Sequence, residues 1–215
     1  MSDVPSGTAE AQLTDGKWYT HLSDFYNPSG PRFCISSKRT PQLELRSPLP
    51  SDAPALLTIL SDRRNTQYDK SCDSLDTPEA IGALIQQWRS FSDPLERANV
   101  VVVISGNVVG TGGLGWIGKR KTDGKMIGDA GILLNPDVRG RGYAYEALRI
   151  IIDHGFHVLG MDEVHVACVD ANAAMKGLMS SKFGFEAAPI QDKQFGNEWI
   201  WRISKDQWRD SPHSA

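Results

Sequence analysis

The segment LLNPDVRGRGYA, residues Leu133 to Ala144, joins an apolar run to a helical pattern through a turn that holds two glycines. Gly140 and Gly142 let the backbone approach an anion closely. The first N–H groups of the following helix have no partner within the helix, and the helix dipole favours negative charge beside them. Arg139 and Arg141 add positive charge at the same place. By spacing alone, a phosphate-binding turn and an ordinary glycine-containing loop with solvated arginines are equally good interpretations.

Strand and helix patterns extend outward from this turn in both directions. Periodicity predicts strands and helices in the order β, two helices, three strands, helix, strand, helix, two strands. This order indicates a mixed α/β sheet and not an even βαβ array. The predicted strands are 43–46, 100–104, 108–117, 127–134, 164–169, a strand from 185 onward and 198–204; the predicted helices begin at 51–52 and 77–78 and cover 143–159 and 172–182.

Composition limits the class of protein. The chain has 215 residues, 40% of them hydrophobic, which suits a single domain with a full core. Lys+Arg 23 against Asp+Glu 26 leaves a net charge of −3, so no global basic field is available to hold nucleic acid. Cys34, Cys72 and Cys168 lack the spacing of a disulfide framework or a metal site. No secretory signal and no apolar run of about 18 residues are present, so we expect a cytoplasmic protein with no membrane and no metal.

Three familiar nucleotide and hydrolase motifs fail on this sequence. A P-loop requires Gly-Lys-Ser/Thr after four spacer residues, and the chain contains none. The run Gly110 to Gly115 matches G-x-G-x-x-G, but Trp116 and Ile117 follow it in place of a helix, which favours a glycine-rich strand. A G-x-S-x-G nucleophile elbow is also missing.

The run Arg139 to Ala144 resembles the Q/R-x-x-G-x-G/A acyl-CoA loop of the GNAT superfamily of acetyltransferases. Further matches to its ribosomal-protein N-terminal acetyltransferase branch occur in the expected order over residues 40–205. They are Thr40 with Leu43–Arg46 and Asp52-Ala53, Gly110-Thr111 with Leu114, Asp129–Leu134 against E-I-G-Y-x-L, Gly142–Leu148, and Asn172 with Phe183-Gly184-Phe185.

This resemblance implies a GNAT-like α/β (α+β) fold with a mostly antiparallel sheet, about four helices, and two parallel strands, 127–134 and 164–169, that splay apart around acetyl-CoA. Backbone N–H groups of Arg141 to Ala144 would hold the pyrophosphate, and a backbone N–H near Leu134 would stabilise the oxyanion. The residues expected to bind the cofactor are Ile132, Leu133, Leu134, Arg139, Gly140, Arg141, Gly142, Tyr143, Ala144 and Asn172.

Asp129 is the expected general base, because an amine acceptor must lose a proton to a base within reach directly or through one water. The alternative is that its carboxylate caps the turn at residues 125–128. Asn172 is expected to bond the pantetheine or orient a water, and it also suits the cap of the helix that follows it. The family pattern has Glu at the position of Asp129, Ser at that of Met175, and in other branches a tyrosine acid at that of Met179. The interval from Asn172 to Gly184 is one residue longer than usual.

The expected function is acetyl-CoA-dependent N-acetyl transfer, directly, to a primary amine of a protein N-terminus or a small molecule. The alternative is a non-catalytic GNAT-fold module that binds acyl-CoA. We expect one domain over residues 40–205, an irregular arm over 1–39 that is partly disordered or packed on the body, and a tail over 206–215, in a monomer or homodimer. Segments 60–74, with Asp62, Asp69 and Asp73 and with Asp76 just beyond its end, and 189–197 are expected to contact the acceptor. Lys119-Arg120-Lys121 is predicted to be a solvated hairpin tip, and His165 a packed residue.

Overall fold

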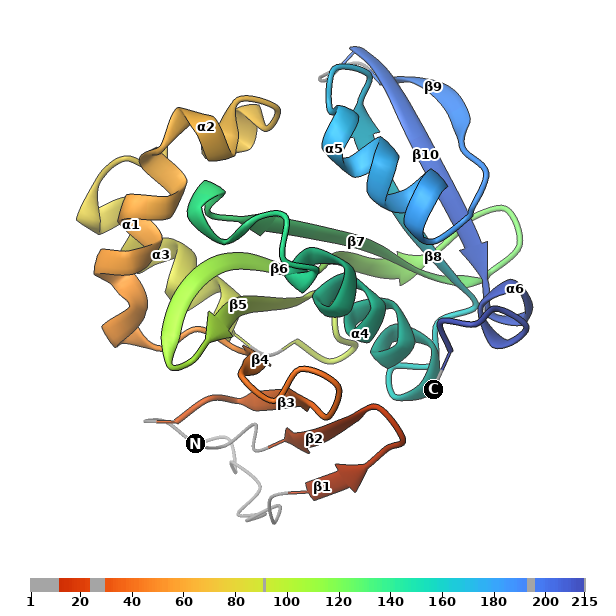
Figure 1. The fold of residues 1–215 in the computed structure, drawn as a ribbon, viewed down its shortest axis with the longest axis horizontal. Coiled ribbons are helices and arrows are strands. Elements are labelled where there is room, and N and C mark those ends of the chain that lie inside the picture. Colours follow the sequence, from red (N-terminus) through yellow and green to blue (C-terminus); the bar gives the residue numbers. More distant parts are fainter. Residues whose placement is uncertain (1–11, 24–29, 91, 193–195, 215) are drawn as a thin grey trace, which may run out of the picture.

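The computed structural model describes residues 12–23, 30–90, 92–192 and 196–214, and its ten strands form one sheet in the order β1-β2-β3-β4-β5-β6-β7-β8-β10-β9 (Figure 1). The strands are β1 Gln12–Asp15, β2 Tyr19–Ser23, β3 Phe33–Ser37, β4 Leu43–Arg46, β5 Ala98–Ile104, β6 Asn107–Lys119, β7 Met126–Leu134, β8 Glu163–Val169, β9 Ala188–Asp192 and β10 Gly196–Ser204. The α-helices are α1 Ala53–Ser61, α2 Arg63–Thr66, α3 Pro78–Arg89, α4 Tyr143–His157, α5 Ala173–Lys176 and α6 Lys205–Arg209.

One parallel pairing interrupts an otherwise antiparallel sheet. β7 pairs with β8 in parallel, and the pairing covers only the residues from Ile127 opposite Glu163 to Asp129 opposite His165. Every other neighbouring pair of strands is antiparallel. Beyond Asp129 the two strands separate. The predicted mixed, mostly antiparallel sheet with splayed parallel strands is therefore confirmed.

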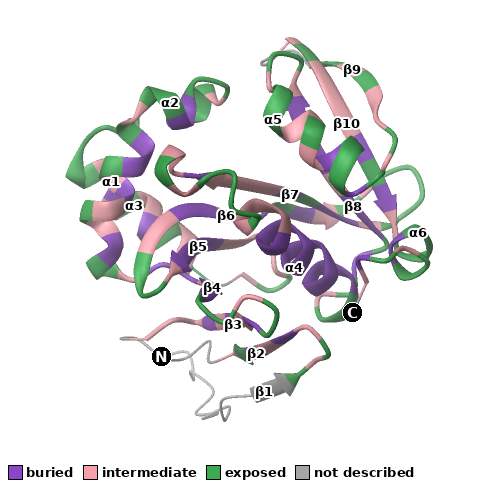
Figure 2. Ribbon diagram, viewed as in Figure 1, coloured by how far each residue is buried: buried purple, intermediate pink, exposed green. Residues whose placement is uncertain are grey.

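Helices cover both faces of the sheet. α4 is buried along nearly its whole length and packs on one face with the larger hydrophobic core, while α1 and α3 pack on the other face with a smaller one (Figure 2). Val100 and Val102 of β5 belong to the first core, and Val101 and Val103 to the second. The run of β-branched residues therefore forms a strand buried on both faces, as predicted.

Local sequence signals set the starts of the helices on the second face. Thr77 caps α3 by accepting a hydrogen bond from the Ala80 N–H, with Pro78 in the first turn. Arg46 at the end of β4 forms a two-pronged ion pair with Asp52, at 2.7 and 2.9 Å, just before α1. Asp52 also accepts from the Leu49 N–H at 2.7 Å, so the connection from strand to helix is held at both ends.

The expectation of irregular structure near the N-terminus is wrong for residues 12–15, 19–23 and 33–37, which are strands β1, β2 and β3. The side chains of β2 and β3 alternate between buried and less buried positions, as expected of strands that extend a sheet. Each strand has only five residues, so its alternation is hard to recognise among the turn residues around it. Tyr19 donates a hydrogen bond at 3.0 Å to Asp153, a buried carboxylate of α4. Trp208, within the expected tail, donates to the same carboxylate at 2.8 Å and is fully buried. Both ends of the chain are therefore attached to α4. The aromatic residues Phe25 and Tyr26, and residues 1–11, lie outside the described residues.

A π-helical turn explains the long interval after Asn172. The predicted helix 172–182 consists of α5 followed by a π-helix, Gly177–Lys182, in which the Phe183 N–H bonds the Leu178 carbonyl five residues back. A π turn absorbs one inserted residue without breaking the helix. Met179 then points into the core and is fully buried, so it takes no part in an open site. No helix among the described residues is long and apolar enough to cross a membrane.

Two buried histidines join β2 to α4 and make stability depend on pH. His154 lies 4.5 Å from His21 between ring centroids, and its Nδ1 has no hydrogen-bond partner. Burial lowers the pKa of His154 to about 3 and lowers that of His21. In the unfolded chain, His154 is protonated below about pH 6.5, whereas in the folded chain it stays neutral until the pH is near 3.

We therefore expect the free energy of unfolding to be complete above pH 6.5 and to fall as pH drops, by about 1 kcal/mol per pH unit from His154. Urea unfolding at pH 7 and pH 5 measures this loss. His154→Leu should reduce the difference between the two pH values. An unchanged difference in that variant would show that His154 is not the residue responsible.

Candidate active site

A cleft of about 1420 Å³ opens where β7 and β8 separate, between α2 on one side and α5 on the other (Figure 1). Its lining comes from both splayed strands, from α3 and from the turn before α4. Ten of the residues singled out from the sequence line it: Asp129, Ile132, Leu133, Leu134, Arg139, Gly140, Gly142, Tyr143, Ala144 and Asn172. Arg141 does not line it. Its exposed side chain lies outside the cleft wall.

The glycine turn adopts a conformation that other residues rarely take. Gly140 has φ +76° and Gly142 has φ +85°, both left-handed, and Gly142 is the N-cap of α4. A Cβ added at either position would meet nothing within 4 Å. These glycines are thus needed for backbone conformation and leave open space above the helix N-terminus, where unpaired N–H groups favour an anion.

Arg139 holds the turn in place. Its Nε donates to the Leu134 carbonyl at 2.8 Å, and its Nη2 donates to Asn65 Oδ1 at 2.8 Å and to the Arg64 carbonyl at 3.3 Å. These bonds join the turn to β7 and to α2. The sequence interpretation placed both arginines as charges at the mouth of an anion site; the structure instead shows Arg139 engaged as a brace.

The orientation of the β7 backbone follows from its glycine neighbours. A Cβ on Gly110 or Gly112 would lie 2.1 Å from the Leu133 carbonyl or 2.8 Å from the Gly131 carbonyl, so both carbonyls point toward β6. Backbone groups alternate along a strand, and those of Ile132 and Leu134 therefore point away from β6, toward the splay. The Leu134 carbonyl already accepts from Arg139. Ile132 thus presents backbone groups to the cleft beyond the parallel pairing.

Asp129 stands at the last residue of the parallel pairing, with 56% of its side chain exposed in the cleft. It does not cap the preceding turn, because Asp123 accepts from the Lys125 N–H and Asp162 from the Met126 N–H. Although the carboxylate remains accessible, the cleft walls remove part of its water, and this desolvation raises its pKa. The neighbouring His165 acts in the opposite direction and lowers it.

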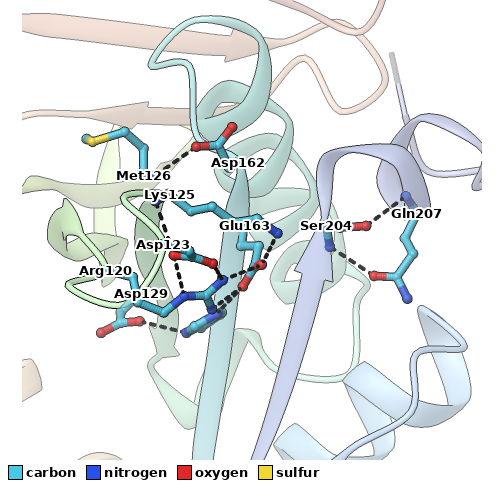
Figure 3. Close-up of polar contacts among 10 residues, drawn as sticks. Arg120, Asp123, Lys125, Met126, Asp129, Asp162, Glu163, Ser204 and Gln207 are labelled. Carbon is cyan, nitrogen blue, oxygen red and sulfur yellow. Dashed lines mark hydrogen bonds and ion pairs between the residues drawn. The ribbon is translucent and has the colours of Figure 1, made fainter.

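A chain of charged residues leads from Asp129 to the β6–β7 hairpin (Figure 3). His165 Nδ1 lies 3.7 Å from Asp129 Oδ1, and its Nε2 lies 3.2 Å from Glu163 Oε2. Glu163 also accepts two bonds from Arg120, at 2.9 and 3.0 Å, and one from Lys125 at 2.9 Å. The hydrogen bond from Arg120 is the main cause that lowers the pKa of Glu163 to about 2. Arg120 is therefore an anchor, which corrects the prediction that Lys119-Arg120-Lys121 is merely solvated.

Asn172 has the capping role that its position suggested. Its Oδ1 accepts from the Met175 N–H at 3.1 Å, which leaves the side-chain NH₂ to donate toward the cleft that the residue lines. In the segment 60–74, Asp62 is bonded to Arg64 and Asp73 to Arg63. The acidic character expected of this wall is thus largely neutralised within the segment.

Two polar residues at the start of β5, one just before the strand and one within it, were missed in the sequence. Arg97 and Asn99 line the same cleft, as does Trp88 of α3. The sequence gives little indication of their role, because they stand at the start of a hydrophobic strand. Only the register of the sheet brings them to the site. The described residues contain no group of three or more His, Cys, Asp or Glu placed to hold a metal.

A family model described as "Acetyltransferase (GNAT) domain" matches residues 42–186 of the chain. The chain belongs to the GNAT acetyltransferases. It is thus an acetyl-CoA-dependent acyltransferase, as the glycine turn and the splayed strands indicated.

Solved structures share the GNAT fold at low sequence identity. The ribosomal-protein-S5-alanine acetyltransferase of Vibrio fischeri is 17% identical, with a TM-score of 0.66 over 78% of this chain and 95% of that one. RimJ of Mycobacterium smegmatis, solved with CoA-disulfide, is 15% identical, with a TM-score of 0.66 over 80% and 86%. The microcin C7 self-immunity acetyltransferase MccE, solved with acetyl-CoA and AMP, is 12% identical, with a TM-score of 0.67 over 83% and 97%.

The glycine turn of this GNAT domain can be tested with a matched pair of variants. Gly142→Trp places a bulky side chain above the N-terminus of α4, and we expect CoA affinity to fall at least 10-fold. Gly124→Trp is the control, because Gly124 also has a left-handed φ, +76°, with open space around it, but it lies in the β6–β7 hairpin. Calorimetric titration with CoA measures both. Equal effects of the two substitutions would contradict the assignment of the turn.

Proposed function

We propose that this GNAT protein transfers the acetyl group of acetyl-CoA directly to a primary amine, either a protein N-terminus or a small molecule. The observation that carries the proposal is the sequence of features along one cleft. A helix N-terminus suited to an anion lies at one end, followed by an unpaired strand edge and then by a carboxylate with a raised pKa. Pyrophosphate, pantetheine and an attacking amine need these three features in this order.

The cofactor is held mainly by backbone groups. N–H groups of Gly142, Tyr143 and Ala144 face the pyrophosphate, and the pantetheine arm pairs with β7 at Ile132 to Leu134 in the place that β8 has left. Asn172 donates its amide NH₂ to the same arm. Arg141 meets the outer phosphates from the surface, while Arg139 and Gly140 set the shape of the turn. Acetyl-CoA supplies the acyl group, and direct transfer within a ternary complex makes positioning a large part of the rate.

The oxyanion is best held by the backbone N–H of Ile132. Leu134, the residue named from the sequence, is five residues from Asp129, which corresponds to about 17 Å along a strand. Ile132 is only three residues away, about 10 Å, and its N–H points toward the splay. An amine placed between Asp129 and the thioester carbon is thus closer to both groups when Ile132 donates to the oxyanion.

Asp129 takes the proton that the amine must lose, directly or through one water. His165 stabilises the ionised form of Asp129, because its Nδ1 lies 3.7 Å from that carboxylate while its Nε2 donates to Glu163. Glu163 in turn is held by Arg120 and Lys125. The proton passes from Asp129 to solvent, because the Asp129 side chain is exposed in the cleft.

The role of Asp129 is tested by Asp129→Asn, which keeps the size of the side chain and removes its basicity. We expect turnover to fall about 10²- to 10⁴-fold, with CoA affinity unchanged. The assay follows release of free thiol from acetyl-CoA with a panel of peptides and small amines. Asp206→Asn, an exposed change in α6 remote from the cleft, is the control. Turnover equal to wild type in Asp129→Asn would remove the residue from the mechanism.

The pH profile provides a separate test of His165. Because Asp129 must be ionised to act as a base, kcat/KM should fall as pH drops through its raised pKa. A cationic His165 lowers that pKa, so His165→Gln should move the acidic limb of the profile to higher pH. A profile that is only scaled down, without a shift, would assign His165 a purely structural role.

A further inference from the structure

The acceptor end of the cleft has a floor built from β5, β6 and β7. Arg97 and Asn99 alternate with Ala98 and Val100, so they share the face of Val101 and Val103, which pack against α1 and α3. Asp129 shares this face, because it alternates with Ala130 of the opposite core. The three polar side chains thus project from the same side of the sheet into one cleft.

Arg97 and Asn99 have no ligand of their own within the protein. Neither side chain makes a hydrogen bond or ion pair with any part of the chain that the structure describes, although both are half-buried. Nearby cations behave differently: Arg64 is bonded to Asp62, and Arg139 to Asn65. A partly desolvated guanidinium and amide side by side, both unengaged, suit a bound anionic group.

The space between Arg97 and Asp129 is kept clear by glycine. A Cβ added at Gly131 would meet nothing within 4 Å, and one at Gly115 would meet only Asn99 Oδ1 and the Asp129 carbonyl, both at 4.0 Å. Neither glycine has a left-handed φ. Packing and conformation therefore do not require glycine at these positions. Their effect is to leave a bare backbone floor in the cleft.

Register sets the spacing of the two charged groups. Ala98 is opposite Leu114, and Trp116 is opposite Asp129, which places Arg97 beside Gly115 and two strands from Asp129. Two strand spacings correspond to about 10 Å between backbones. The glycine turn before α4 lies beyond Leu134, at the far end of β7. Arg97 is thus remote from the site of the pyrophosphate and belongs to the acceptor.

We propose that the acceptor is a primary amine that also carries a carboxylate, which Arg97 and Asn99 bind while Asp129 receives the amine. The proposal rests on the function proposed above. One guanidinium and one amide match the single charge of a carboxylate, whereas a phosphate dianion would stay partly uncompensated. Asp129 stands on the other side of the floor, so an acceptor with both charges binds in one orientation.

The test compares acceptors that differ only in one carboxylate. The peptide Ala-Glu-Ala-amide is paired with Ala-Gln-Ala-amide, and free alanine with alaninamide. Wild type should acetylate at least one acidic member with a kcat/KM about 10- to 100-fold above its neutral partner. The pair that shows the preference identifies the source of the carboxylate, an acidic second residue or a free amino acid. No preference in either pair overturns the proposal.

Variants then assign the preference to Arg97. Arg97→Gln should raise KM for the acidic acceptor about 10-fold or more with little change for the neutral one, and Arg97→Lys should restore part of the difference. Arg209→Gln, which alters a 63%-exposed side chain of α6, is the control and should retain the full preference. Equal losses on acidic and neutral acceptors in Arg97→Gln would contradict a specific role.

The floor is tested by Gly115→Val, which should leave the unfolding temperature and CoA affinity unchanged while it weakens acceptor binding. Calorimetric titration of the CoA-loaded protein with the peptides separates this proposal from the function on which it rests. If no amine is acetylated but acidic peptides still bind through Arg97, the carboxylate site stands and the transfer function fails. If neutral amines are acetylated and Arg97→Gln changes nothing, the function stands and the carboxylate site fails.

Discussion

The early end of the β7–β8 pairing determines most of what this molecule can do. A parallel pair would normally continue and satisfy the backbone groups of both strands. Here the pairing ends at Asp129, and the edge of β7 at Ile132 and Leu134 is left facing a cleft. Because the backbone groups of Ile132 need a partner, an extended ligand with amide groups, such as pantetheine, fits there as an added strand. The glycine turn and the acceptor floor are then placed at the two ends of that strand.

The positions of individual charged groups in the cleft matter more than the net charge of the chain. The net charge of −3 conceals a helix N-terminus preceded by the exposed Arg141, an accessible carboxylate in Asp129, and an unengaged cation in Arg97. The other charged side chains near the cleft are largely paired with one another, as in the Arg64–Asp62 and Arg120–Glu163 bonds. Arg97, which makes no hydrogen bond or ion pair among the described residues, therefore stays available to a ligand of the cleft.

Much of the fold could be predicted, because its signals are local. The β-branched run of β5, the cap at Thr77 and the glycine turn each describe their own element. The features that the sequence did not predict depend on contacts between residues that are far apart in the chain. β2 and β3 are strands because they continue a sheet, Arg139 is a brace because α2 lies beside its turn, and Arg97 joins Asp129 only through the register of β6. The extra residue after Asn172 was visible in the sequence, but its accommodation as a π turn was not.

The brace at Arg139 has a consequence for the order of events. The Arg139 side chain ties the glycine turn to α2, and the residues that follow α2, Gln67 to Asp69, also line the cleft. Any ligand that immobilises the turn thereby also immobilises this part of the cleft wall. The first ligand then bears the entropic cost of ordering the wall, and a second ligand binds with a smaller cost. Such a linkage is reciprocal, so acetyl-CoA and the acceptor would each strengthen the binding of the other by the same factor.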